Sequence, residues 1–106
     1  MNDTEYHQLA EKTLLAIEEA VEALDIDLDY ETTDGMLEVI FQNDTRIIIN
    51  KQAPIHQIWV ATKFNGHHFD WKDSQWIDNR SGMELWDLLD DAASKQSGQT
   101  VQLGRA

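Results

Sequence analysis

The chain has 106 residues with one proline and no cysteine, and 42% of its residues are hydrophobic. These values predict a single domain over residues 1–106 with its own core, and they exclude disulfides and thiolate metal sites. Twenty acidic residues against eight basic ones give a net charge of −12, which argues against nucleic acid and anionic membranes as direct partners. The charge instead favours metal cations or a basic protein surface.

The sequence shows no targeting or membrane-spanning segment. Its longest apolar runs, such as residues 14–17, have four residues, whereas a membrane helix needs about 20. The first five residues contain neither the basic nor the apolar segment that is typical of a signal peptide. Together with the lack of cysteine, these features predict a cytoplasmic protein.

Residues 4–24 predict an amphipathic helix. One stripe of this helix consists of residues at three- and four-residue spacing: Tyr6, Leu9, Ala10, Thr13, Leu14, Ile17, Ala20, Val21 and Leu24. From Asp25 the period changes to two, because Ile26, Leu28 and Tyr30 alternate with acids. This alternation predicts a strand over residues 25–31 with one buried face and one wet face.

Five further strands are predicted, separated by short polar turns that indicate an antiparallel meander: 36–42, 46–50, 57–62, 67–71 and 75–78. A second helix is expected over residues 82–97, with Ser81 and Glu84 as its capping box and Gly98 as its end. The tail from residue 99 is expected to fray. The predicted fold is therefore an α+β two-layer sandwich, with two terminal helices on one face of an antiparallel sheet of about six strands.

The acidic charge is concentrated at the start of the chain. Residues 1–34 hold eleven acids and one base, which is −10, while the other 72 residues carry only −2. Glu18 and Glu22 are like charges four residues apart, and Glu22 and Asp25 lie at the helix C-terminus, where the helix dipole disfavours anions. Several unfavourable charge placements in one part of a helix often indicate a functional surface.

Two interpretations of this acidic surface stay open: a solvated face that keeps the protein soluble, or a site for hard cations. An EF-hand is excluded, because a loop starting at Asp25 would have Tyr30 where glycine is needed and Met36 where glutamate is needed. Alternating carboxylates on a strand lie roughly 6–7 Å apart. A cation site here should therefore be open, shallow and weak.

The wet face of the predicted sheet carries an aromatic side chain. Alternation places Trp59 on the same face as Gln57 and Lys63, and it places His68 and Asp70 outward in the next strand. A tryptophan on a polar sheet face is either an interface residue or a side chain that only packs on its neighbours.

The histidines give a weak metal signal. His67 and His68 are adjacent in a predicted strand and should point to opposite faces, so they cannot readily share one ion. These two and His56 are interpreted as surface or packing residues. No nucleophile elbow, phosphate loop, dinucleotide-binding glycine pattern or zincin helix is present, so the chain is not expected to be an enzyme.

A long segment of the chain resembles a known family. The run Asn50-Lys51-Gln52-Ala53-Pro54-Ile55-His56-Gln57-Ile58-Trp59, followed by Gly66-His67-His68-Phe69-Asp70-Trp71, closely resembles the central signature of the frataxin family, and its bacterial CyaY branch in particular. The similarity extends through the acidic N-terminal helix and residues 78–82 and 86–89, and so covers nearly the whole chain.

The resemblance implies a role in iron–sulfur cluster assembly. Family members bind Fe2+ and Fe3+ weakly, and other divalent or trivalent cations can take the place of iron. The residues implied as metal ligands, here called the acidic ridge, are Glu11, Glu18, Glu19, Glu22, Asp25, Asp27, Asp29 and Glu31. The implied partners are the cysteine desulfurase and the cluster scaffold protein. The residues implied to contact them are Glu18, Glu19, Glu22, Asp25, Asn50, Gln52, Trp59 and His68.

Three hypotheses about function follow. The first is an iron-binding regulator of cluster assembly, which slows the desulfurase according to iron supply. The second is an iron store or buffer, a mainly monomeric protein that assembles when excess iron neutralises the acidic ridge. The third is an acidic interaction module whose metal binding is incidental.

Overall fold

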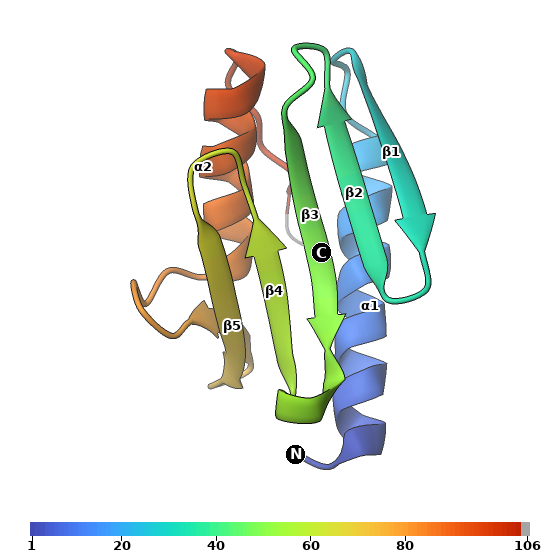
Figure 1. The fold of residues 1–106 in the computed structure, drawn as a ribbon, viewed down its shortest axis with the longest axis vertical. Coiled ribbons are helices and arrows are strands. Elements are labelled where there is room, and N and C mark those ends of the chain that lie inside the picture. The colour runs from blue at the N-terminus through green and yellow to red at the C-terminus, as the bar shows by residue number, and fades with distance from the viewer. Residues whose placement is uncertain (105–106) are drawn as a thin grey trace.

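The computed structural model describes residues 1–104 and confirms the predicted α+β sandwich (Figure 1). Two helices lie on the same side of one antiparallel sheet, whose strand order is β1-β2-β3-β4-β5-β6. The elements are α1 (Asp3–Glu22), β1 (Leu28–Thr33), β2 (Met36–Phe41), β3 (Arg46–Gln52), the 3₁₀ turn η1 (Ala53–Ile55), β4 (Gln57–Ala61), β5 (Gly66–Lys72), β6 (Gln75–Asp78) and α2 (Leu85–Ser97).

The core lies between the sheet and the two helices. Helix α1 contributes the buried residues Tyr6, Ala10, Ile17 and Val21, which follow the predicted helical stripe. The sheet contributes alternate residues, since successive strand side chains point to opposite faces. The buried residues of β2, β3, β4 and β5 are Leu37, Val39, Phe41, Ile47, Ile49, Ile58, Val60 and Phe69. The other face of the sheet is open and carries the polar side chains.

The start of the first strand, the start of the second helix and the cap of that helix differ from the sequence prediction. The first strand begins at Leu28 instead of Asp25, because residues 25–27 form the connection from α1 to the sheet edge. Helix α2 begins at Leu85, and Glu84 is its N-cap, with its carboxylate accepting bonds from the amides of Trp86 and Asp87. The prediction of Ser81 as the N-cap is wrong, because the backbone of Gly82 is left-handed, with φ +76°, and the helix cannot begin directly after Ser81.

The prediction that the tail from residue 99 frays is wrong for residues 99–104, and residues 105–106 lie outside the described residues. Val101 is buried, and its amide donates to the Ser94 hydroxyl at 2.8 Å. The Leu103 amide donates to the Asp90 carboxylate at 2.9 Å, and the Leu103 side chain packs on the core. Gly98 ends α2 in the left-handed conformation, as predicted, and this turn directs residues 99–104 back onto the domain.

Candidate cation and partner-binding surfaces

Three acids of α1 lie on the helix flank beside the sheet edge. Glu11, Glu18 and Glu22 follow each other at seven- and four-residue spacing, so they form one row. Glu11 and Glu18 of this row line a groove of about 260 Å³ between α1 and the β1–β2 turn. Glu11 forms an ion pair with Lys51 at 3.2 Å, so part of the charge at this end of the row is already balanced.

Tyr30 connects this row of acids to β1. Partial burial raises the pKa of the Tyr30 hydroxyl, and the carboxylates of Glu22 and Glu18 raise it further, with the hydroxyl hydrogen-bonded to Glu22. Because Tyr30 faces α1, its strand neighbours Asp29 and Glu31 point to the opposite face of the sheet.

The acidic ridge therefore lies on two faces of the sheet. It wraps around the sheet edge that β1 forms, with the α1 acids on the helix side and Asp29 and Glu31 on the open face. On the open face Glu31 lies across from Glu38, which forms an ion pair with Arg46 at 2.8 Å.

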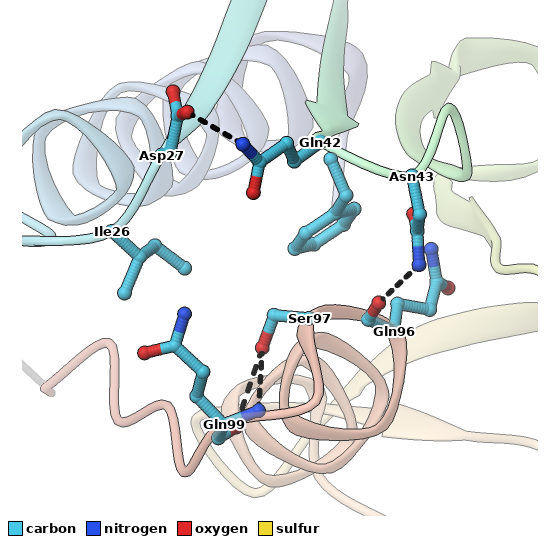
Figure 2. A pocket seen from close by; sticks show the side chains of 8 residues that line it. Ile26, Asp27, Gln42, Asn43, Gln96, Ser97 and Gln99 are labelled. Atoms are coloured by element: carbon cyan, nitrogen blue, oxygen red, sulfur yellow. Dashed lines mark hydrogen bonds between the residues drawn. The ribbon is translucent and has the colours of Figure 1, made fainter.

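The connection between α1 and β1 carries Asp25 and Asp27, and the remaining acid of the ridge, Glu19, lies near the end of α1. Asp27 accepts a hydrogen bond from the Gln42 side chain at 3.0 Å, at the rim of a pocket of about 210 Å³ (Figure 2). Asp25 and Glu19 are exposed, and neither has a hydrogen-bond or ion-pair partner within residues 1–104.

The ridge acids remain separate from one another. Within the described part of the chain, no three Asp, Glu or His side chains lie close enough together to hold one metal ion. Carboxylate oxygens are nevertheless the ligands that hard cations prefer. The ridge can offer single or paired carboxylates to an ion that keeps much of its water.

The second candidate surface lies on the open face of the sheet. Asn50, Trp59 and His68 occupy one row across β3, β4 and β5. The rings of Trp59 and His68 are stacked, with centroids 4.4 Å apart and an interplanar angle of 13°. Gln52, also predicted, lies opposite Gln57 in the register of β3 and β4. The four residues of the predicted open-face set therefore come together.

Two residues of this surface were not among the predicted site residues. Gln57 accepts a hydrogen bond from the Trp59 indole at 2.8 Å, and it donates one to Asp70 at 2.9 Å. This chain of contacts fixes the orientation of the indole on the open face. Strand alternation placed both Gln57 and Asp70 on this face, but only the structure shows that they hold Trp59.

Tyr6 of α1 supports the same surface from the helix side of the sheet. Its hydroxyl donates to the Gln57 carbonyl at 2.6 Å and accepts from the Gln52 amide at 3.0 Å, so it joins the two ends of η1. These residues lie 46 and 51 positions from Tyr6 in the sequence. No local pattern could have revealed this contact.

We expect Tyr6→Phe to lower the free energy of unfolding by about 1–3 kcal/mol, because two partly buried backbone groups lose their partner. Urea denaturation at neutral pH measures this loss. The matched control is Tyr30→Phe, for which we expect less than about 1 kcal/mol because that hydroxyl lies beside acids at the sheet edge. Equal losses of unfolding free energy in the two variants would show that the hydrogen bonds of the Tyr6 hydroxyl do not stabilise the fold specifically.

His67 and His68 point to opposite faces, as predicted. His68 stacks on Trp59 on the open face, while His67 Nδ1 lies 2.8 Å from the Asp78 carboxylate on the helix side. Asp78 is only 2% exposed. Burial raises the pKa of Asp78, but bonds from the Arg80 amide, His67 and the Ser81 hydroxyl outweigh burial, so its pKa lies below the usual value.

The lowered pKa of Asp78 predicts a loss of stability in acid. A carboxyl group with a lower pKa in the folded state stabilises the fold above its unfolded pKa of about 3.9, and this contribution is lost as the pH falls through the folded pKa. We expect Asp78→Asn to cost about 2 kcal/mol at neutral pH and to lose less further stability between about pH 5 and pH 2 than the parent protein.

Chemical denaturation across this pH range measures the effect. Asp3→Asn is the control, because Asp3 also has a lowered pKa and a histidine partner, His56, but lies in solvent, where such pairs contribute little. The same pH profile in Asp78→Asn and the parent would contradict the assignment.

The chain is similar to known proteins over nearly its whole length. A sequence model of the frataxin-like domain matches residues 1–99. The chain is 56% identical to the "Iron-sulfur cluster assembly protein CyaY" of Tolumonas auensis, over 98% of this chain and 100% of the relative. It is 51% identical to the protein of the same name from Pseudoalteromonas atlantica, over 99% of this chain and 97% of that protein.

Solved structures agree with this match. Frataxin from Psychromonas ingrahamii is 45% identical and superposes with a TM-score of 0.91, over 99% of this chain and all of the other. Trimeric frataxin from Saccharomyces cerevisiae, complexed with ferrous iron, is 28% identical with a TM-score of 0.69, over 90% of this chain and 87% of the other. The match supports the prediction that the chain is not an enzyme. No helix within residues 1–104 is long and apolar enough to cross a membrane.

Proposed function

Because this chain belongs to the frataxin-like family, we propose that it is an iron-binding regulator of iron–sulfur cluster assembly. Its bacterial relatives carry the name of iron–sulfur cluster assembly proteins, and the related yeast frataxin has been crystallised with ferrous iron. The observation that carries the proposal is the acidic ridge on α1 and β1, which lies at the edge of a sheet whose open face carries Trp59.

Iron is the cargo of the acidic ridge. Glu11, Glu18, Glu19, Glu22, Asp25, Asp27, Asp29 and Glu31 supply oxygen ligands that suit Fe2+ and Fe3+, and other hard cations can take their place. Binding is weak because the carboxylates lie apart and no group of three converges within residues 1–104. Weak binding suits an ion that must be released to another protein.

The partners are the cysteine desulfurase and the cluster scaffold protein. Glu18, Glu19, Glu22 and Asp25 present an anionic surface to a basic partner, which should give fast, salt-sensitive association. The row Asn50, Trp59 and His68, with Gln52 beside it, supplies a second contact surface on the open face of the sheet. The protein acts in the cytoplasm, mainly as a monomer.

An iron titration separates this function from storage. We expect Fe2+ to raise the melting temperature more than NaCl at equal ionic strength, because ions that bind only the folded ridge stabilise it by mass action. The mass in solution should stay that of a monomer of 12.2 kDa. Growth into large assemblies as iron is added in excess would favour the store. Identical shifts of the melting temperature with both salts would show that the cations only screen the ridge charges.

A further inference from the structure

The outer edge of β1 carries unpaired backbone groups. The Phe41 amide of β2 donates to the carbonyl of Thr45, just before β3, at 2.9 Å. In an antiparallel ladder successive residues direct their N–H and C=O groups to alternate neighbours, so the even-numbered residues of β2 face β1, where their partners are the odd-numbered residues of that strand. The N–H and C=O groups of Leu28, Tyr30 and Thr32 consequently point away from the sheet.

No element of the described chain pairs with this edge. Figure 1 shows β1 as the outermost strand on its side of the sheet, with no element beyond it. Within residues 1–104, no hydrogen bond joins the backbone of Leu28, Tyr30 or Thr32 to another segment. The six register pairs between β1 and β2 run without a bulge, and β1 contains no proline. The edge is therefore regular and long enough to pair with a further strand.

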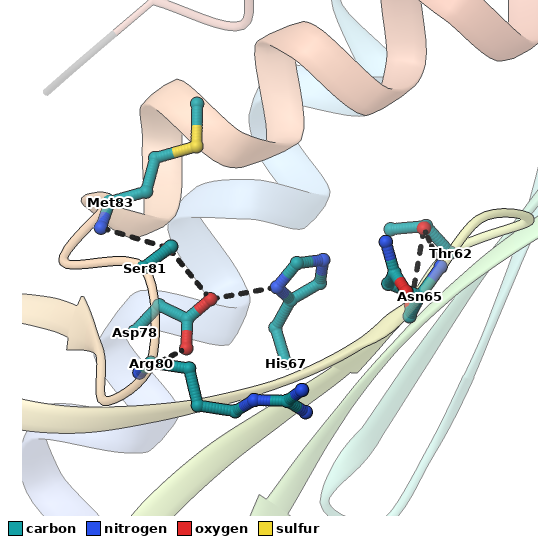
Figure 3. Close-up of polar contacts among 7 residues, drawn as sticks. All are labelled: Thr62, Asn65, His67, Asp78, Arg80, Ser81 and Met83. Carbon is teal, nitrogen blue, oxygen red and sulfur yellow. Dashed lines mark hydrogen bonds and ion pairs between the residues drawn. The ribbon is translucent and has the colours of Figure 1, made fainter.

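The opposite edge of the sheet is closed by the chain itself. Asp78 ends β6, and its amide donates to the Met83 carbonyl at 2.9 Å while its carbonyl accepts from the Gly82 amide at 2.9 Å. Figure 3 shows the Asp78 carboxylate, which also accepts bonds from the Ser81 hydroxyl and the Arg80 amide and so holds this segment in place. The chain thus covers the end of the β6 edge with its own residues but leaves the β1 edge to another molecule.

Charge determines which kind of strand can pair with β1. Asp29 and Glu31 are exposed on the open-face side of this edge. On the helix side, Glu18 and Glu22 lie close to Tyr30. Side chains directly opposite each other in neighbouring strands lie about 4.5–5.5 Å apart, and like charges at this distance are destabilising. A second copy of β1 is therefore repelled, whereas a strand with lysine or arginine opposite Asp29 and Glu31 is attracted.

The helix side of the same edge offers apolar contacts. Thr32 of β1 and the α1 residues Leu14 and Leu15 line the groove of about 260 Å³ between the helix and the β1–β2 turn. The Leu15 side chain is 54% exposed. An apolar side chain placed beside this groove removes part of the Leu15 surface from water, which favours binding.

We propose that the outer edge of β1 binds an extended basic segment of a partner protein by strand addition. The added strand runs antiparallel to β1, as every paired strand of this sheet does, and exchanges hydrogen bonds with Leu28, Tyr30 and Thr32. Its basic side chains lie opposite Asp29 and Glu31, and its alternate, apolar side chains lie on the helix side. The proposal rests on the proposed function for the charge of the partner, and it adds how that partner is held.

Three peptides distinguish strand pairing from charge attraction. All have blocked ends and alternate lysine with valine; the first is unmodified, the second is N-methylated at its valine amides and the third at its lysine amides. In the proposed register the valines lie opposite Leu28, Tyr30 and Thr32, so their amides face β1 and the lysine amides point away. We expect methylation of the valine amides to weaken binding about tenfold or more, and methylation of the lysine amides to leave it unchanged.

An NMR titration of the 15N-labelled protein at constant ionic strength measures each affinity from the amide shifts of residues 28–33. The unmodified peptide should also slow hydrogen exchange at the amides of Leu28, Tyr30 and Thr32, which it pairs. The amides of Asp29 and Glu31 should change little, because they are already bonded to β2.

A variant at the edge tests the same pairing from the protein side. Thr32→Pro removes an outward N–H but keeps every charge and the bonds to β2, because proline is tolerated in an edge strand where its nitrogen faces solvent. We expect it to weaken binding of the unmodified peptide about tenfold or more. The matched control is Thr32→Val, which keeps the amide and should bind like the parent. Circular dichroism verifies that both variants are folded.

Two results would overturn strand addition: no binding of the unmodified peptide, or equal binding of the unmodified and valine-methylated peptides by the parent protein. Equal, salt-sensitive binding of both would leave the acidic ridge as a contact surface for a basic partner. The failure of this inference is therefore distinguishable from a failure of the proposed function, which binding of the desulfurase measures.

Discussion

Replacing Glu18, Glu22 and Asp25 with lysine should abolish binding to the cysteine desulfurase. The reversals turn an anionic patch into a cationic one and change the net charge from −12 to −6, since each adds two units. Charge complementarity governs association with a basic surface, so we expect the association rate to fall by about 10- to 1000-fold at low salt. Binding of the parent protein should weaken as salt increases.

The control for this experiment reverses three exposed acids outside the ridge: Asp44, Asp73 and Asp91. This control has the same net charge as the ridge variant. It therefore distinguishes the effect of charge at the ridge from the effect of the net charge of the protein. Surface plasmon resonance against immobilised desulfurase gives both rates, and circular dichroism verifies folding. Equal loss of binding in the two triple variants would contradict a role of the ridge as the contact surface.

Trp59→Ala should weaken binding to the assembly partners by about 2 kcal/mol or more, which is about 30-fold in affinity. Tryptophan is the residue type most often found to dominate interface energies, and Trp59 is preorganised by Gln57 and His68. The indole is only partly buried, so its removal should leave the fold intact.

Two further variants define the contribution of the indole. Trp59→Phe keeps an aromatic ring but loses the bond to Gln57, and it should retain part of the affinity. Phe64→Ala removes an aromatic side chain that is 53% exposed in the β4–β5 turn and should have no effect. Isothermal titration with the scaffold and with the desulfurase measures each affinity. If Trp59→Ala bound both partners like the parent, the open-face surface would not be an interface.

The fold was predictable because each element carries a local period. The α1 stripe, the alternation in β2 to β5 and Gly98 at the end of α2 all depend on neighbours close in sequence, and the structure confirms them. The predicted N-cap of α2 was wrong because two side chains that can accept from the helix amides, Ser81 and Glu84, lie within four residues of each other. The left-handed backbone of Gly82 and the hydrogen bond that the Ser81 hydroxyl donates to Asp78 decide between them.

The candidate sites were predictable in composition but not in arrangement. Alternation placed Trp59 and His68 on one face, which the structure confirms. The sequence did not show that the acidic ridge wraps around the β1 edge, since this depends on Tyr30 packing toward α1. It also could not show that Tyr6 joins Gln52 and Gln57, or that His67 meets Asp78, because these contacts exist only in the folded chain.

The most direct test of the proposed function measures cluster formation on the scaffold protein by the desulfurase over a range of Fe2+ concentrations, with and without this protein. An iron-responsive regulator should slow the reaction by an amount that depends on iron, and the Glu18, Glu22 and Asp25 reversals should remove that dependence. The Asp44, Asp73 and Asp91 variant should behave like the parent. A rate that this protein does not change, or changes equally at every iron concentration, would contradict the account.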